Sequence, residues 1–330
     1  MKSNITGNKN TASGYSTLRF NETGVGNTAT GYAALYGNTE GHYNTAAGYY
    51  ALYSNTEGEH NAASGFSALK GNTTGYQNTA MGSQALFTNT VGYNNSALGF
   101  GALQFNTTGY ANTAIGYHAL FENDDGNRNS AAGYRALSNN VSGFENTAFG
   151  NLSLIKNDDG DRNTASGSGA LSSNTTGSNN SAVGFYALYS NVRGYENTAV
   201  GSYADVTSVE LSNATAIGFD AKVDASNKIQ LGNSNISSVA TAGKLTTGSV
   251  TYPNSHGTTG QVLGTNGSGE LVWLDRSQIA AIHQEELEEQ VASLQDQLQS
   301  QQEELLAIVQ SQQEQIAQLQ SMVEHQFAMN

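Results

Sequence analysis

The chain has 330 residues, of which only 12% are charged and 37% are hydrophobic, with 38 glycines, one proline and no cysteine. So few apolar residues argue against large ordinary hydrophobic cores, and so few charges argue against a disordered chain expanded by charge repulsion. The absence of cysteine excludes disulfides, thiolate metal sites and cysteine nucleophiles. A net charge of −14 without a basic patch makes nucleic acid and anionic membrane surfaces unsuitable partners, because both bind through Lys and Arg.

The N-terminal residues, Met1 to Gly7, lack the apolar segment of a signal peptide. No apolar run approaches the roughly 18 residues that cross a bilayer, so we expect no membrane span. A repeat that begins almost at Met1 would leave strand edges uncovered at that end. We therefore expect a docking protein or a further segment there.

The motif Asn-Thr-Ala-x-Gly recurs every 17 residues from Asn10 to Asn197, and its glycine continues in register to Gly218. A leucine follows four residues after the glycine, from Leu18 to Leu188, and a second Asn and a second Gly complete the unit N-T-A-x-G-Y-x-A-L-x-x-N-T-x-G-x-x. An unbroken period indicates identical units stacked on one another, and 17 residues are too few for a helix pair. We predict an all-β parallel β-solenoid (β-roll) over residues 1–222, with one coil per repeat and thirteen coils. At roughly 4.8 Å per coil it would be about 60 Å long.

The fixed positions of the repeat have physical roles in such a coil. Repeated asparagines at turn corners stack into amide ladders, the first glycine allows positive φ or close backbone approach, and Ala and Leu fill a narrow interior. The position before the first glycine is often apolar although it lies on the opposite strand face from the inward alanine. We expect a partner subunit to cover it, which makes these residues trimer-interface candidates: Met81, Leu98, Ile115, Phe149, Val183, Val200 and Ile217.

Two other columns raise the question of ligands. Aromatic residues recur after the second glycine and are receptor-contact candidates, since rings on a rod can stack on sugars: Tyr76, Tyr93, Tyr110, Phe144 and Tyr195. A purely structural ring ladder is the favoured interpretation. The Thr/Ser column after the first Asn invites an ice-binding interpretation by analogy, but the flanking Asn and Ala leave no obvious double-threonine face.

Two acidic pairs sit two repeats apart at the same turn, Asp124 with Asp125 and Asp158 with Asp159. Clustered acids beside glycine are candidate calcium ligands, but the EF-hand spacing is missing and Arg128 and Arg162 are close enough in sequence to neutralise them. We favour plain turns here. The six histidines share no metal-ligand spacing, and no catalytic motif is present, so we expect neither a cofactor nor enzymatic activity.

The repeats weaken after Gly201: Asp205 stands where leucine is expected. Residues 223–276 read as a Gly/Ser/Thr-rich β connector, with strand-like pieces at 228–231 and 270–274. Residues 277–330 then contain fifteen glutamines, nine acids and no Lys or Arg. They predict a coiled coil of about 70 Å with a stutter near Gln301. Its seam residues are further trimer-interface candidates: Val291, Leu294, Leu298, Leu305, Val309, Ile316, Leu319 and Val323.

The repeats, together with Asn213–Ala221 (Asn-Ala-Thr-Ala-Ile-Gly-Phe-Asp-Ala), resemble the β-roll heads of trimeric autotransporter adhesins. The connector is similar to segments of bacterial and phage tail-fibre-like proteins at Leu231–Asn233, Val250–Asn254, Gly257–Leu263 and Asn266–Gly269, before Trp273. The membrane anchor of the first family and the self-cleaving chaperone of the second have no counterpart among these motifs. We expect attachment and trimer assembly to use other elements, or a longer chain.

The resemblances imply a homotrimeric structural fibre or adhesin that meets a receptor, either a glycan or a surface protein, outside the cell as part of a virion, an injection device or a cell-surface fibre. A docking protein would bind the N-terminal end or the coiled coil. Two alternatives stay open at this point: a passive spacer or assembly scaffold, and a solenoid that binds glycan or ice. The strand number of the coil is not fixed by its seam, and three is the choice that the solenoid face also favours.

Overall fold

The computed structural model describes residues 3–240, 242, 245–247, 250–252, 257–265 and 270–327. The chain divides into two compact units, Met1–Ser238 and Val239–Asn330. His256 and the connector motifs around Pro253 and Gly267 lie outside the described residues.

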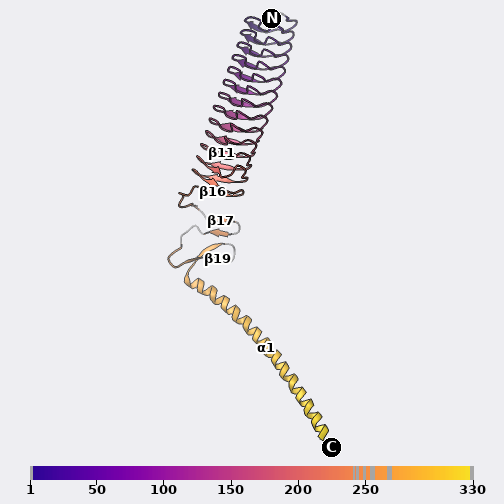
Figure 1. Cartoon of the computed structure of the whole chain (residues 1–330), viewed down its shortest axis with the longest axis vertical. Helices are drawn as coiled ribbons and strands as arrows, with labels where there is room; N and C mark the ends of the chain where they lie inside the picture. Colours follow the sequence, from indigo (N-terminus) through magenta and orange to yellow (C-terminus); the bar gives the residue numbers. More distant parts are fainter. Residues whose placement is uncertain are drawn as a thin grey trace. The chain divides into compact units, whose positions relative to one another are not determined.

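The first unit is a stack of coils, each contributing one short strand to a long sheet (Figure 1). Within the described residues, fourteen strands form one sheet: β1 (Thr11–Ser13), β2 (Thr28–Thr30), β3 (Thr45–Ala47), β4 (Ala62–Ser64), β5 (Thr79–Met81), β6 (Ser96–Leu98), β7 (Thr113–Ile115), β8 (Ser130–Ala132), β9 (Thr147–Phe149), β10 (Thr164–Ser166), β11 (Ser181–Val183), β12 (Thr198–Val200), β14 (Thr215–Ile217) and β16 (Ile229–Leu231).

Neighbouring strands of this sheet are parallel and in register at the repeat period. Ala114 of β7 pairs with Ala131 of β8, for example, 17 residues further on. Stacked rings on successive coils are 4.9 Å apart, close to the ordinary spacing between strands. The prediction of a parallel β-solenoid with 17-residue coils is therefore confirmed. The sheet continues past residue 222, because Thr215 of β14 pairs with Ile229 of β16 after a shortened step of 14 residues.

The interior is narrow and built from small residues. The middle alanine of each strand from β2 to β12 and of β14 points inward and is buried, while its two neighbours face outward. Opposite it, the leucines from Leu18 to Leu188 are fully buried with φ between 47° and 53°. Left-handed backbone costs a branched residue roughly 1–2 kcal/mol, which full burial of leucine, worth about 1.5–3 kcal/mol, offsets. The leucine N–H groups also bind the next coil, as from Leu103 to the carbonyl of Ala119 at 3.0 Å.

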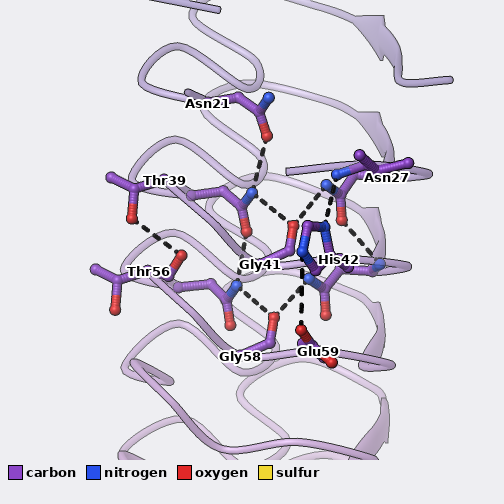
Figure 2. Close-up of polar contacts among 12 residues, drawn as sticks. Asn21, Asn27, Thr39, Gly41, His42, Thr56, Gly58 and Glu59 are labelled. Atoms are coloured by element: carbon purple, nitrogen blue, oxygen red, sulfur yellow. Dashed lines mark hydrogen bonds and ion pairs between the residues drawn. The ribbon is translucent and has the colours of Figure 1, made fainter. Parts of the chain in front are cut away.

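Both asparagine columns lie inside the solenoid as hydrogen-bonded ladders (Figure 2). In the second column, Asn38 Nδ2 donates to Asn21 Oδ1 at 2.9 Å and to the carbonyl of Gly41 at 3.0 Å. In the first column, Asn27 Oδ1 accepts from the N–H of Asn44 at 2.9 Å, and Asn27 Nδ2 donates to the same Gly41 carbonyl at 2.8 Å. The glycine carbonyl thus joins the two ladders. Hydrogen bonds to these buried amides offset the cost of removing them from water, which allows a polar interior.

The glycines of the repeat are needed for two different reasons. Gly116 has φ 131°, and a Cβ there would overlap the carbonyl oxygen of Gly133 in the next coil. Gly41 has no positive φ, but a Cβ would collide with Asn38 Oδ1 and the carbonyl of Gly58. The first position therefore needs glycine for both conformation and space, and the second for space alone beside the amide ladder.

Residues 3–10 continue the repeat as half a coil. Asn4 Oδ1 accepts from Asn21 Nδ2 at 2.9 Å, and the N–H groups of Ile5 and Thr6 bind the carbonyl of Glu22 at 2.9 and 3.1 Å. The expectation that the N-terminal end of the solenoid is uncovered is therefore wrong on the side that residues 3–10 cover. On the strand side, Ala12 of β1 is exposed, unlike its buried equivalents in later coils. A docking protein at this end stays a prediction.

The wall opposite the sheet changes where the leucine column ends. Asp205 and Lys222 take the leucine position, the left-handed conformation is lost, and β13 (Asp205–Val206) pairs in parallel with β15 (Lys222–Val223). The side chains of Val206 and Val223 are buried in place of leucine.

In its described residues, the second unit holds two antiparallel strand pairs followed by a helix. β17 (Leu245–Thr247) pairs with β18 (Val250–Tyr252), and β19 (Val262–Thr265) pairs with β20 (Leu271–Leu274). The helix α1 (Arg276–Phe327) has 52 residues, about 78 Å at 1.5 Å per residue. Asp275 caps it: Asp275 Oδ1 accepts from the N–H of Gln278 at 2.9 Å, and Gln278 Oε1 accepts from the N–H of Asp275 at 3.0 Å. Bonds from Ser277 and Gln278 lower the pKa of Asp275.

Candidate interaction surfaces

The outer face of the long sheet carries two parallel columns of side chains. The Thr/Ser column and the residue before the first glycine both point away from the interior, on either side of the buried alanine. In the first four coils the second column is small or polar: Ser13, Thr30, Ala47 and Ser64. From β5 onward it is mostly apolar, and its predicted members are 42–50% exposed: Met81, Leu98, Ile115, Phe149, Val183, Val200 and Ile217. An apolar stripe therefore runs along the sheet over residues 81–217.

The predicted seam of α1 is also exposed, since the helix makes no extensive contact with another described element. All of its predicted members are 41–63% exposed: Val291, Leu294, Leu298, Leu305, Val309, Ile316, Leu319 and Val323. The structure adds Leu287, which lies beside Val291 on one helix face and extends the seam by one step of four residues. The helix is continuous through Gln301, which a stutter permits.

The aromatic column after the second glycine forms a ladder over three coils. Tyr76, Tyr93 and Tyr110 stack at 4.9 Å with interplanar angles of 5° and 1°. Both faces of Tyr93 are therefore covered by its neighbours, and the Arg128 guanidinium lies 5.7 Å from the centre of the Tyr110 ring. A ligand at this ladder would meet ring edges more than ring faces.

The other two receptor-contact candidates stand apart from this ladder. Phe144 lies two coils beyond Tyr110, with the Arg162 guanidinium 5.1 Å from its ring centre. Tyr195 lies three coils further and is 54% exposed. The structure does not bring Phe144 or Tyr195 into ring contact with Tyr76, Tyr93 or Tyr110.

A second aromatic column, at the position after the first glycine, is one that the sequence analysis did not single out. Tyr15, Tyr32, Tyr49 and Phe66 stack at 4.9–5.6 Å, and Phe100, Tyr117 and Tyr134 stack at 5.5 Å. The tyrosine that follows the first glycine of the repeat unit is the sequence signal of this column.

The acidic pairs do not converge. The coil of Val141 lies between them: Asp124 N–H binds the carbonyl of Val141, and Val141 N–H binds that of Asp158, at 3.0 and 2.9 Å. Among the described residues, no group of three His, Asp or Glu side chains could hold a metal ion.

The expectation that Arg128 and Arg162 neutralise these acids is wrong, because both pair with Glu145. The atoms Arg128 Nη1 and Glu145 Oε1 are 3.2 Å apart, and Arg162 Nε and Glu145 Oε2 are 3.4 Å apart. All three side chains are exposed, so these pairs add little stability.

Comparison with known proteins adds no family: neither protein-family models nor curated proteins match the chain. In the part of the chain that the structure describes, no helix has the length and apolar character to cross a membrane.

Proposed function

We propose that the chain is a subunit of a homotrimeric structural fibre, in the manner of a tail fibre or a surface adhesin. The solenoid forms a stiff rod and the helix forms a coiled-coil stalk. It acts outside the cell, in a virion, an injection device or a cell-surface fibre, by presenting its surface to a receptor. It needs no cofactor and catalyses no reaction.

The observation that carries this proposal is the apolar stripe on the sheet. Monomeric proteins seldom leave a long apolar stripe in water. This one is interrupted by Ser166, and because it follows a parallel sheet over many coils it fits a partner with the same repeat. A second copy with the same axial register supplies that match by symmetry. The exposed seam of α1 also requires a partner that covers it, because an amphipathic helix of this kind gains most of its stability from packing.

The number three comes from the resemblance to trimeric autotransporter heads, in which such β-rolls trimerise side by side. Association of parallel copies of the chain would cover both the stripe on the sheet and the seam of α1. The acidic helix α1 carries no Lys or Arg after Arg276, so its association depends on the apolar seam and not on ion pairs.

The stripe is tested by placing charge on it. Leu98→Glu with Ile115→Glu would bury carboxylates in the proposed interface, so we expect the double variant to lose at least 100-fold in association by analytical ultracentrifugation. Val91→Glu is the matched control, because Glu40 and Glu57 occupy its position in other coils. If the double variant associates as well as Val91→Glu does, the stripe is not the interface.

A passive spacer is the competing function. It is favoured by the stacked ladder of Tyr76, Tyr93 and Tyr110, whose ring faces cover one another. Binding on a glycan array that disappears when all three are changed to alanine would favour adhesion through this column. Binding to no glycan and to no cell surface would favour the spacer.

A further inference from the structure

The end of the leucine column opens a cavity in the solenoid wall. It has a volume of about 350 Å³ and is lined by Tyr186, Tyr189, Ser190, Tyr203, Asp205 and Lys222. That volume lies at the small end of the range of ligand pockets, about 300–1,000 Å³. None of the lining residues belongs to the outward columns of the sheet, so the cavity is separate from the apolar stripe.

Asp205 supplies a buried acceptor on the floor of this cavity. The residue is 4% exposed, and its Oδ1 accepts from the N–H groups of Ser190 and Val206 at 3.1 and 2.9 Å. Its Oδ2 lies 3.7 Å from Lys222 Nζ, beyond hydrogen-bond distance. The side chain of Ser190 also bonds to the carboxylate. A carboxylate has about four lone-pair sites, so with these three bonds it keeps the capacity to accept from a ligand hydroxyl.

Lys222 supplies the donor beside it. Its Nζ donates to the carbonyl of Tyr203 at 2.9 Å and lies 3.4 Å from Asp220 Oδ1. An ammonium has three donors, so one remains for a ligand oxygen. The negative charges of Asp205 and Asp220 surround this one cation, which gives no net attraction for an anionic ligand.

Three tyrosine rings complete the cavity. Tyr186 and Tyr203 are roughly parallel with centres 6.0 Å apart, looser than the 4.9 Å of the other ladder, and Tyr189 meets Tyr186 edge-on at 5.1 Å. Tyr203 and Tyr189 are both exposed. Aromatic rings give an apolar surface on which the C–H face of a sugar packs, beside groups that bind its hydroxyls.

We propose that this cavity binds a neutral pyranose sugar. The ring of the sugar packs on the tyrosines, one hydroxyl donates to Asp205 Oδ2, and one hydroxyl oxygen accepts from Lys222 Nζ. The site is distinct from the ladder of Tyr76, Tyr93 and Tyr110, and it stands whether or not the rod forms a trimer.

Saturation-transfer NMR with the full chain tests the site directly. The probes are the methyl pyranosides of glucose, galactose, mannose and N-acetylglucosamine, with glycerol and glutamate as non-sugar controls. We expect at least one pyranoside to bind with a dissociation constant in the millimolar range and neither control to bind.

The variants use residues that the repeat already accepts. Asp205→Leu restores the leucine of the column, and Tyr203→Ser introduces the residue that Ser16 and Ser67 occupy in equivalent coils. Each should weaken binding at least tenfold, while Tyr93→Ser, which copies Ser178 in the other aromatic column, should leave it unchanged. Unaltered circular dichroism of each variant shows that the coil is intact.

Several results would overturn the proposal. They are the failure of every pyranoside to bind, binding that survives both Asp205→Leu and Tyr203→Ser, and loss of binding in Tyr93→Ser. Binding of glutamate with no pyranoside would also overturn it, because the cavity would then recognise charge.

Discussion

The internal asparagine ladder gives a prediction that can be worked from the structure. Asn106 Nδ2 donates to Asn89 Oδ1 at 2.8 Å and to the carbonyl of Gly109 at 2.9 Å, and Asn106 Oδ1 accepts from Asn123 Nδ2 at 2.8 Å. Asn106→Ala removes all three bonds. The Gly109 carbonyl keeps a bond from Asn95 Nδ2 at 2.8 Å, so two buried groups lose a partner: Asn89 Oδ1 and one N–H of Asn123.

Each buried polar group without a partner costs about 1–3 kcal/mol, so we expect Asn106→Ala to destabilise its coil by about 4 kcal/mol. Coils interact only with their neighbours in a solenoid, so the loss should be local. Hydrogen exchange followed by mass spectrometry measures it: 4 kcal/mol corresponds to roughly 10³-fold faster exchange through local opening. Peptides covering residues 86–126 should show the change and peptides covering residues 27–60 should not.

Thr108→Ala is the matched control, because Thr108 is exposed in the same coil. Surface substitutions of this kind change stability by less than about 0.5 kcal/mol. Equal exchange rates in Asn106→Ala and Thr108→Ala would refute the claim that the amide ladder stabilises the coil.

Three further predictions concern the glycines, the buried acid and the helix. Gly116→Ala should destabilise by more than about 3 kcal/mol in chemical denaturation because it meets both positive φ and the Gly133 carbonyl. Gly101→Ala lies where Ala33 is native and also has positive φ, but its nearest neighbours are the side chains of His118 and Gln104, so it should cost only about 1–2 kcal/mol. Burial raises the pKa of Asp205, so the folded state holds its proton more tightly than the unfolded chain, and the stability contributed by this group falls as pH rises from the unfolded pKa through the folded one. As pH rises from about 3 to 7, the melting temperature of the native chain should therefore fall relative to that of Asp205→Asn. No change in this difference, or a change of opposite sign, would contradict the prediction. Leu298→Glu should lower the midpoint of helix melting at 222 nm by at least about 10 °C, while Ser293→Glu, which adds the same charge off the seam, should lower it by no more than about 2 °C; equal effects would place the seam elsewhere.

The period of the sequence was enough to predict the solenoid, because identical spacing of Asn, Gly and Leu admits one stacked arrangement. The inward alanine and the outward position beside it also followed from strand alternation. The left-handed conformation of Leu103 and its equivalents could not be predicted, since leucine disfavours positive φ and only the closure of a short coil imposes it. The asparagines were placed at turn corners by their local preference, whereas hydrogen bonds between coils hold them in the interior.

The sequence predicts some of the candidate surfaces and not others, because periodicity shows which positions are exposed but does not show which contacts form between coils. Exposed columns such as Met81 and the seam of α1 follow from periodicity alone. The cavity at Asp205 does not, because it depends on Tyr186 and Tyr203 at one position of two successive coils, on Tyr189 at another position, and on the loss of the leucine conformation. The sequence marked Asp205 as a departure from the repeat, and a departure from a strict period is the signal by which such a site can be found.

The mass of the purified chain in solution tests the central claim most directly. Light scattering should give about 104 kDa, three times the 34.6 kDa of one chain, and residues 1–276 alone should remain associated if the stripe on the sheet is part of the interface. A mass of 34.6 kDa for the full chain at micromolar concentration would contradict the trimeric fibre and leave a single solenoid that acts through its own cavity.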